Sequence, residues 1–134
     1  MKQVVILRGI PGCGKSTFAE LLRWSRRNSF ICSADHFFTS SDGTYKFDRT
    51  MLGKAHMQCQ QKFQQAISLK AELIIVDNTN VDERDMTFYE EKAKEAGYQV
   101  THIIVENRHN GVSVHNVPDE TITRMVDRFK VKLK

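Results

Sequence analysis

One short segment constrains the possible folds of this chain more than any other. Residues 9–16 have the sequence GIPGCGKS, which fits the pattern G-x-x-x-x-G-K-[ST]. Glycine lacks the Cβ atom that bars positive φ, so such a segment can turn sharply and direct successive backbone N–H groups at a phosphate. A β-branched apolar run at residues 4–7 precedes it, and apolar side chains recur at helical spacing after it. This context favours a phosphate-binding loop between a buried strand and a helix over a glycine-rich turn that happens to contain a lysine.

The residue types of this loop match the parts of a nucleoside triphosphate. The helix that follows contributes unpaired N–H groups and the positive end of its dipole. Lys15 is expected to reach the β- and γ-phosphates as a positive charge, and the Ser16 hydroxyl is expected to hold Mg²⁺. We therefore expect a nucleotide and Mg²⁺ as ligands, with the phosphate site formed by Gly9, Pro11, Gly12, Cys13, Gly14, Lys15, Ser16 and Thr17.

Length and composition limit the remaining possibilities. A chain of 134 residues is expected to form a single domain, residues 1–134, so any acceptor site shares the sheet that carries the loop. The net charge of +4 is a mild surplus that does not by itself indicate a nucleic-acid partner. Cys13, Cys32 and Cys59 are odd in number and lack metal-ligand spacing, which favours reduced thiols in a cytoplasmic protein. Without a signal peptide or an apolar run of membrane-spanning length, no membrane association is expected.

Strands and helices are expected to alternate along the chain. The hydrophobic pattern predicts strands at residues 2–8, 29–33, 73–77 and 98–106, and helices at residues 15–28, from Asp48 onward, at residues 83–96 and from Pro118 onward. Alternation of this kind implies parallel strands joined by right-handed crossovers. We therefore predict an α/β fold, the three-layer P-loop NTPase architecture of nucleotide kinases, with a parallel sheet of four or five strands.

Ligands of such sheets bind beyond the carboxyl ends of the strands. The four ends are followed by the phosphate-binding loop, by Asp35, by residues 77–80 and by residues 106–108, so these polar stretches are expected to meet at one edge. Asp77 ends a continuous apolar run, where an acid can hold a water of Mg²⁺ or orient Ser16, and we expect both residues at the metal. Asp35 is the candidate for taking a proton from an acceptor hydroxyl, with a helix cap or turn residue as the alternative. His36 is a weaker candidate base.

Arginines after the last predicted strand are candidates for a lid. Residues 107–118 are a loop rich in Asn, His and Gly that contains Arg108, and Arg124 and Arg128 follow on the final predicted helix. A mobile loop of this kind can close over a nucleotide and bring positive charge to the transition state. We expect Arg108 and Arg124 to act in catalysis and Arg124 and Arg128 to contact the nucleotide. Ordinary surface charge is the alternative for each.

Four segments together resemble a known family. They are residues 6–17, 33–35, 74–80 and 115–118, with the sequences ILRGIPGCGKST, SAD, IIVDNTN and HNVP. In this combination the chain resembles, over nearly its whole length, the small P-loop kinases of the polynucleotide 5′-hydroxyl kinase type, including the kinase-like domain of the myelin cyclic-nucleotide phosphodiesterase. The resemblance implies ATP-dependent phosphoryl transfer to a hydroxyl. It also implies that Asp35 is the general base, that Lys15 and Ser16 serve the phosphates and Mg²⁺, and that a lid carries an arginine.

The resemblance leaves the phosphate acceptor open. Phage-type polynucleotide kinases have an arginine three residues after the base, which holds the substrate phosphate, and Phe38 occupies that position here. The first candidate acceptor is a single-stranded nucleic acid or nucleotide with a 5′-hydroxyl, and the second is a small metabolite such as a sugar or an antibiotic. The third possibility is an ATP-binding module that transfers no phosphate. The absence of an Asn-Lys-x-Asp motif argues against a GTPase.

Overall fold

A parallel sheet forms the centre of the molecule. The computed structural model describes residues 1–11 and 13–106. Within these residues the sheet has four strands in the order β2-β3-β1-β4, and every pairing is parallel. The strands are β1 (Gln3–Arg8), β2 (Ser29–Cys32), β3 (Leu73–Asp77) and β4 (Gln99–Ile104). The predicted α/β fold with parallel strands is confirmed.

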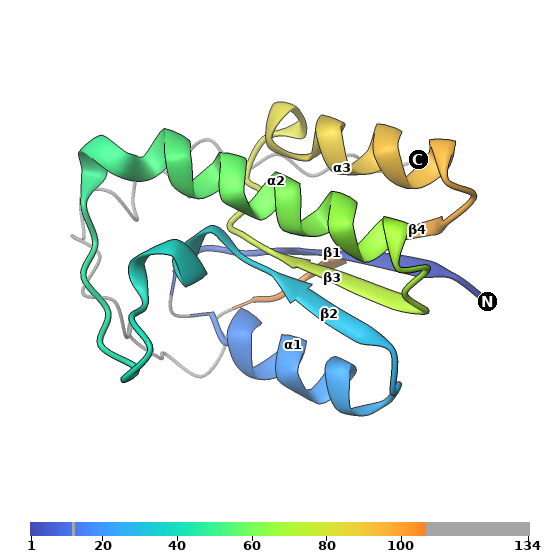
Figure 1. The fold of residues 1–134 in the computed structure, drawn as a ribbon, viewed down its shortest axis with the longest axis horizontal. Helices are drawn as coiled ribbons and strands as arrows, with labels where there is room; N and C mark the ends of the chain where they lie inside the picture. The colour runs from blue at the N-terminus through green and yellow to red at the C-terminus, as the bar shows by residue number, and fades with distance from the viewer. Residues whose placement is uncertain (12, 107–134) are drawn as a thin grey trace.

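Helices cover both faces of the sheet. The helix α1 (Lys15–Trp24) lies on one face, and α2 (Leu52–Ser68) and α3 (Glu83–Glu95) lie on the other, which gives three layers (Figure 1). Alternate side chains of β1 enter two cores: Val5 and Leu7 pack with α1, while Val4 and Ile6 pack on the side of α2 and α3. The continuous apolar runs of β1 and β3 are thus those of strands buried on both faces.

The ends of α3 follow local signals in the sequence, whereas α1, predicted over residues 15–28, ends at Trp24. Asp82 caps α3 in a reciprocal capping box with Asp85, and Gly97, at φ 80°, follows the end of this helix. The helix expected to start at Asp48 begins later. Asp48 instead caps a short 3₁₀ turn, η2 (Arg49–Met51), by accepting a hydrogen bond from Thr50 N at 3.0 Å, and α2 starts only after this turn.

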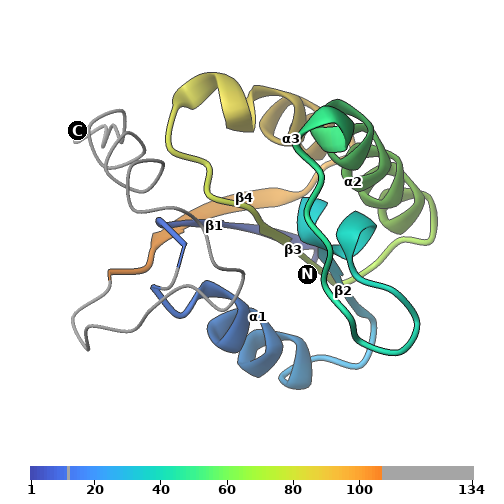
Figure 2. The same cartoon turned by 90° about the vertical axis from the view of Figure 1, so that its left-hand side faces the viewer.

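The strand ends define where a ligand can bind. Figure 2 looks onto the carboxyl ends of the strands, where the loop after β1, the 3₁₀ turn η1 (Ala34–Phe38) after β2 and the segment after β3 lie together. The first of these loops carries the GIPGCGKS sequence. In the sheet, β3 lies between β1 and β2. The residues that follow these three strands are therefore neighbours in space.

Several predicted features lie outside the described residues. They are Gly12, the lid at 107–118, the helix expected from Pro118, and Arg108, Arg124 and Arg128. In the part of the chain that the structure describes, no helix combines the length and apolar character needed to cross a membrane. The thiols of Cys13, Cys32 and Cys59 are buried and not in disulfides.

Candidate functional site

The loop after β1 is folded tightly around Gly9. A Cβ atom at this position would lie 2.5 Å from Cys13 Sγ and 2.7 Å from the carbonyl oxygen of Val105, so only glycine fits. Gly9 N donates to the carbonyl oxygen of Thr79 at 3.0 Å, which ties the start of the loop to the segment after β3. Gly14 has φ 97°, the left-handed region that glycine adopts at little cost. The loop therefore has the close backbone approach that a phosphate-binding loop requires.

The positive end of the helix after the loop has no side-chain cap within the described residues. Gly14 is the N-cap of α1, so no side chain caps its first N–H groups, and its first turn contains no acidic residue. Lys15 and Ser16 occupy the first two helical positions. Exposed N–H groups and the helix dipole at such an end attract anions, and the Lys15 ammonium adds a full charge. This combination fits the phosphates of a nucleotide.

A serine and a buried acid meet beside this helix end. Ser16 Oγ donates to Asp77 Oδ2 at 3.1 Å, and Asp77, the last residue of β3, is only 7% exposed. Burial raises the pKa of the Asp77 carboxyl, while the charge of Lys15 and the hydrogen bond from Ser16 oppose that rise. Hydroxyl and carboxylate oxygens are the donors that Mg²⁺ prefers. The donor set at Ser16 and Asp77 therefore fits the metal expected from the sequence.

Asp35 lies at the same edge of the sheet. It follows β2 in η1, whose backbone is held by Ser33 Oγ, the acceptor for Asp35 N at 3.2 Å, and by Asn78 Oδ1, the acceptor for Ala34 N at 2.9 Å. Because Asn78 follows β3 directly, this second bond joins the ends of two neighbouring strands. The charges of Asp35 and Lys15 both act on the Asp77 carboxyl. The structure thus brings Asp35, Lys15, Ser16 and Asp77 together.

A known protein family matches nearly the whole chain. Residues 4–131, nearly the whole chain, match the family described as AAA domain. The chain belongs to this AAA domain family. A curated relative of this AAA domain is human NEDD4-binding protein 2, which is 33% identical over 137 residues. That match covers 95% of the chain but only 8% of the human protein.

Two solved structures share the fold of this AAA domain. One is the Pnkp1/Rnl/Hen1 RNA repair complex, with a TM-score of 0.60 and 19% identity over 95% of this chain and 37% of that one. The other is the Mycobacterium tuberculosis APS kinase CysC in complex with AMPPNP and APS, with a TM-score of 0.54 and 14% identity over 92% of this chain and 67% of that one. At these identities the likeness establishes the fold, which is that of a P-loop kinase.

His36, the weaker candidate base of this AAA domain, faces a lysine. Lys62, on α2, has its ammonium nitrogen 3.3 Å from His36 Nδ1. Burial and then the charge of Lys62 lower the pKa of the His36 imidazole, which keeps the ring neutral. An ammonium can only donate, so Nδ1 accepts this hydrogen bond and the ring proton sits on Nε2. Nδ1 is therefore already engaged, which leaves Asp35 as the stronger candidate base.

Several residues that shape the site were given no individual role by the sequence analysis. Tyr45 donates from its hydroxyl to Asp35 Oδ1 at 3.2 Å, and Asn78 and Lys62 make the contacts given above. Arg8, at the end of β1, is 5% exposed and donates from Nε to the carbonyl oxygen of Asn80 at 2.9 Å. A charged residue at the end of a buried strand is a signal that could have pointed to Arg8. No comparable signal pointed to Tyr45, because its partner lies ten residues earlier.

Asn80 fastens the phosphate-binding loop to the sheet. It is 2% exposed with φ 48°, a left-handed conformation that asparagine tolerates better than most residues. Its Nδ2 donates to the carbonyl oxygen of Leu7 at 2.7 Å and to that of Asn78 at 3.1 Å. Since Leu7 lies two residues before Gly9, these bonds fix the point where the loop leaves β1.

We expect Asn80→Ala to lower the free energy of unfolding by about 2–4 kcal/mol, because it removes one buried and one partly buried hydrogen bond and leaves alanine in the left-handed region. Urea unfolding measures this change. Asn28→Ala is the matched control, since Asn28 Nδ2 donates to the carbonyl oxygen of Lys70 in an exposed setting at 3.3 Å. The control is expected to lose less than about 0.5 kcal/mol. Equal losses in the two variants would contradict the role given to Asn80.

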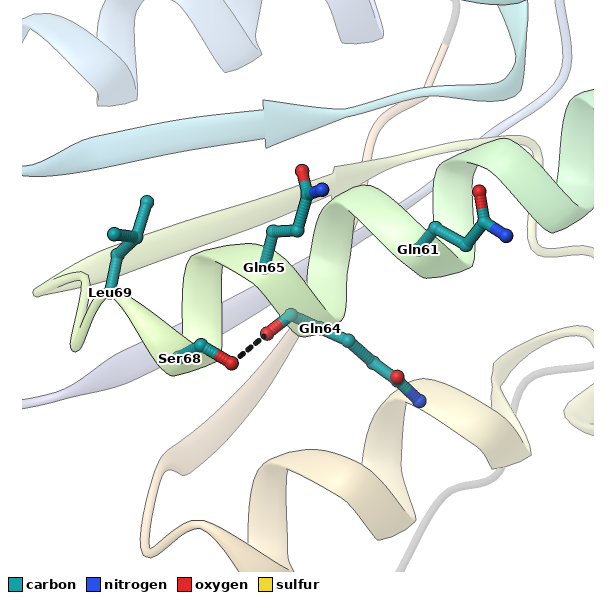
Figure 3. Close-up of a pocket in the computed structure, with 5 residues that line it drawn as sticks. All are labelled: Gln61, Gln64, Gln65, Ser68 and Leu69. Atoms are coloured by element: carbon teal, nitrogen blue, oxygen red, sulfur yellow. Dashed lines mark hydrogen bonds between the residues drawn. The ribbon is translucent and has the colours of Figure 1, made fainter.

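One shallow hollow on the described surface lies away from these residues. Gln61, Gln64, Gln65, Ser68 and Leu69 line it on the outer side of α2 (Figure 3). None of these side chains titrates, and Ser68 Oγ donates to the carbonyl oxygen of Gln64 in its own helix at 3.1 Å. This part of α2 leads into the start of β3, the opposite edge of the sheet from Asp35 and Lys15. The hollow has no group suited to catalysis.

Proposed function

We propose that this chain is an ATP-dependent kinase that transfers the γ-phosphate to a hydroxyl, and that its acceptor is the 5′-hydroxyl of a polynucleotide or nucleotide. One observation carries the proposal. The Asp77 carboxyl accepts a hydrogen bond from Ser16, and it is close enough to Lys15 and Asp35 for the charges of both to act on it. The residues suited to hold a triphosphate and the acid suited to activate an acceptor therefore lie at one edge of the sheet.

The phosphates of ATP are held by the loop and by the start of α1. Gly9, Pro11, Gly12, Cys13 and Gly14 supply the backbone, and Lys15, Ser16 and Thr17 supply N–H groups and side chains. Ser16 and Asp77 are the residues that would hold Mg²⁺, which neutralises charge on the phosphates when it is bound. The structure of the APS kinase, which has the same fold, contains AMPPNP, an ATP analogue. This supports ATP as the nucleotide.

The transfer step assigns one role to Asp35. The acceptor oxygen forms a bond to the γ-phosphorus while the bond from that phosphorus to the β,γ-bridging oxygen breaks, and ADP leaves with the electron pair of the broken bond. The Asp35 carboxylate takes the proton of the acceptor hydroxyl. Lys15 stabilises the charge on the phosphoryl oxygens. Positioning and charge supply most of the rate acceleration in such reactions, so few groups suffice.

Aromatic side chains beside Asp35 support an acceptor that contains a base. Phe38 is 7% exposed and packs against Phe37, Tyr45 and Phe47, with ring centroids 5.2, 6.2 and 5.0 Å away. Phe47 is 53% exposed, so it can offer a ring face for stacking, whereas buried Phe38 cannot. The RNA repair complex with the same fold supports the same class of acceptor.

The remaining parts of the proposal concern residues outside the described range. Residues 1–134 act as one kinase domain, and the segment 107–118 acts as a lid over the nucleotide. Arg108 and Arg124 bring positive charge to the transferred phosphoryl group, and Arg124 and Arg128 contact ATP. Their support is the sequence alone.

A panel of acceptors tests the proposed function. The protein is incubated with γ-labelled ATP, Mg²⁺ and, in separate reactions, 5′-hydroxyl DNA and RNA oligonucleotides, nucleosides and sugars. We expect label in the oligonucleotides and none in a 5′-phosphorylated oligonucleotide of the same sequence. Label only in a small molecule would replace the acceptor while keeping the chemistry. ATP binding without transfer to any acceptor would contradict a kinase function.

A further inference from the structure

The backbone of Asp35 is fixed on several sides. Ser33 Oγ accepts from Asp35 N at 3.2 Å, and the carbonyl oxygen of Asp35 accepts from Thr39 Oγ1 at 3.1 Å. The preceding residue, Ala34, donates its N–H to Asn78 Oδ1 at 2.9 Å. With the backbone held in this way, the direction of the carboxylate depends on the two side-chain torsions of Asp35. A catalytic carboxylate has to be held within a narrow range of geometry to act on an acceptor.

Tyr45 meets that carboxylate. Its hydroxyl donates to Asp35 Oδ1 at 3.2 Å in a partly buried setting. Burial first, and then the charge of Asp35 and this hydrogen bond, raise the pKa of the Tyr45 phenol, so the hydroxyl keeps its proton and remains a donor. The ring is held as well, because it packs edge-on against Phe38 with centroids 6.2 Å apart. The ring contact with Phe38 thus holds the Tyr45 side chain in place while its hydroxyl contacts Asp35.

A closed turn at residues 39–45 places Tyr45 in this position. Thr39 and Tyr45 form an antiparallel bridge, and Ser40 N donates to the carbonyl oxygen of Thr44 at 2.9 Å. Gly43 closes the turn at φ 86°, and Asp42 Oδ1 accepts from Thr44 N at 2.9 Å. The bridge brings residue 45 back beside η1, where the Tyr45 ring contacts Phe38.

We propose that Tyr45 is the positioning residue of Asp35, whose hydroxyl fixes the carboxylate in the direction needed to take the acceptor proton. This inference rests on the proposed kinase function and adds a residue to it. In this role Tyr45 acts through Asp35, so its removal lowers the rate of transfer and leaves ATP binding intact. A hydrogen bond to an ionised group is among the stronger ones in proteins, which sets the size of the effect.

The variant Tyr45→Phe tests the inference, because it keeps the ring packing and removes only the hydroxyl. With a 5′-hydroxyl oligonucleotide as acceptor, we expect kcat to fall about ten- to a hundredfold, while the Kd for ATP stays within about twofold. Tyr98→Phe is the matched control. Its hydroxyl donates to the carbonyl oxygen of Ala71 at 2.8 Å, ahead of β3 and β4 at the far edge of the sheet, so its kcat should stay within about twofold of wild type.

A double-mutant cycle separates positioning from a merely structural role. If Tyr45 acts through the Asp35 carboxylate, Tyr45→Phe has no further effect on kcat once Asp35 is replaced by Asn. The inference would be overturned if the loss of kcat in the double variant equalled the product of the losses in the two single variants, or if kcat of Tyr45→Phe stayed within twofold of wild type. The kinase function would stand in either case. A wild-type protein that binds ATP but phosphorylates no acceptor would overturn both.

Discussion

Replacing Asp35 with Asn is expected to lower phosphoryl transfer by at least about a hundredfold while the affinity for ATP stays within a few-fold of wild type. Asn has nearly the shape of Asp but cannot accept the proton of the acceptor hydroxyl. The hydrogen bonds to Ser33 Oγ and from Thr39 Oγ1 use backbone atoms of Asp35, so the substitution leaves them in place. The loss should therefore appear in kcat, measured with saturating ATP and acceptor.

The control for this experiment is Glu91→Gln, which neutralises an exposed carboxylate on α3 without changing the size of the side chain. Its turnover should equal that of the wild type. A thermal unfolding scan of both variants checks that neither result comes from unfolded protein. Unchanged turnover in Asp35→Asn would remove Asp35 from the role of general base. A large loss of ATP affinity in this variant would instead place Asp35 in nucleotide binding.

The elements that position the site were predictable because they depend on local patterns. The strand β1, the glycine-rich loop and α1 are marked by an apolar run, by a motif and by helical spacing within 24 residues. Asp35 and Asp77 were predictable as neighbours because residues at the ends of parallel strands meet at one edge, whatever the order of the strands. The order β2-β3-β1-β4 itself depends on crossovers that no single segment encodes.

The residues that support the site were not predictable, because their contacts depend on how the elements pack. Tyr45 reaches Asp35 only through the closed turn at residues 39–45, and Lys62 meets His36 only because of the way α2 lies against η1. Asn80 gives one usable signal, since asparagine is one of the few residues that tolerate a positive φ. Its bond to the carbonyl oxygen of Leu7 still requires β1 and β3 to be paired.

Replacing Lys15 with Ala is expected to lower kcat/KM for ATP by at least about a hundredfold, because it removes the positive charge from the phosphate site. Lys94→Ala, on the exposed side of α3, is the matched control and should keep wild-type activity. Both values come from initial rates at increasing ATP concentration. A fully active Lys15→Ala variant would contradict the assignment of residues 9–16 as the phosphate-binding loop.

The same variant should also change the dependence of activity on pH and Mg²⁺. The pKa of the Asp77 carboxyl is raised by burial, and Lys15 is the strongest influence that opposes this rise. Without Lys15 this pKa rises further, so Asp77 takes up a proton at a higher pH and its affinity for Mg²⁺ begins to fall at a higher pH. The residual activity of Lys15→Ala should thus decline, as pH falls, at a higher pH than in wild type, and added Mg²⁺ should partly restore it. If activity declined at the same pH in the two proteins, Lys15 would have no influence on the pKa of Asp77.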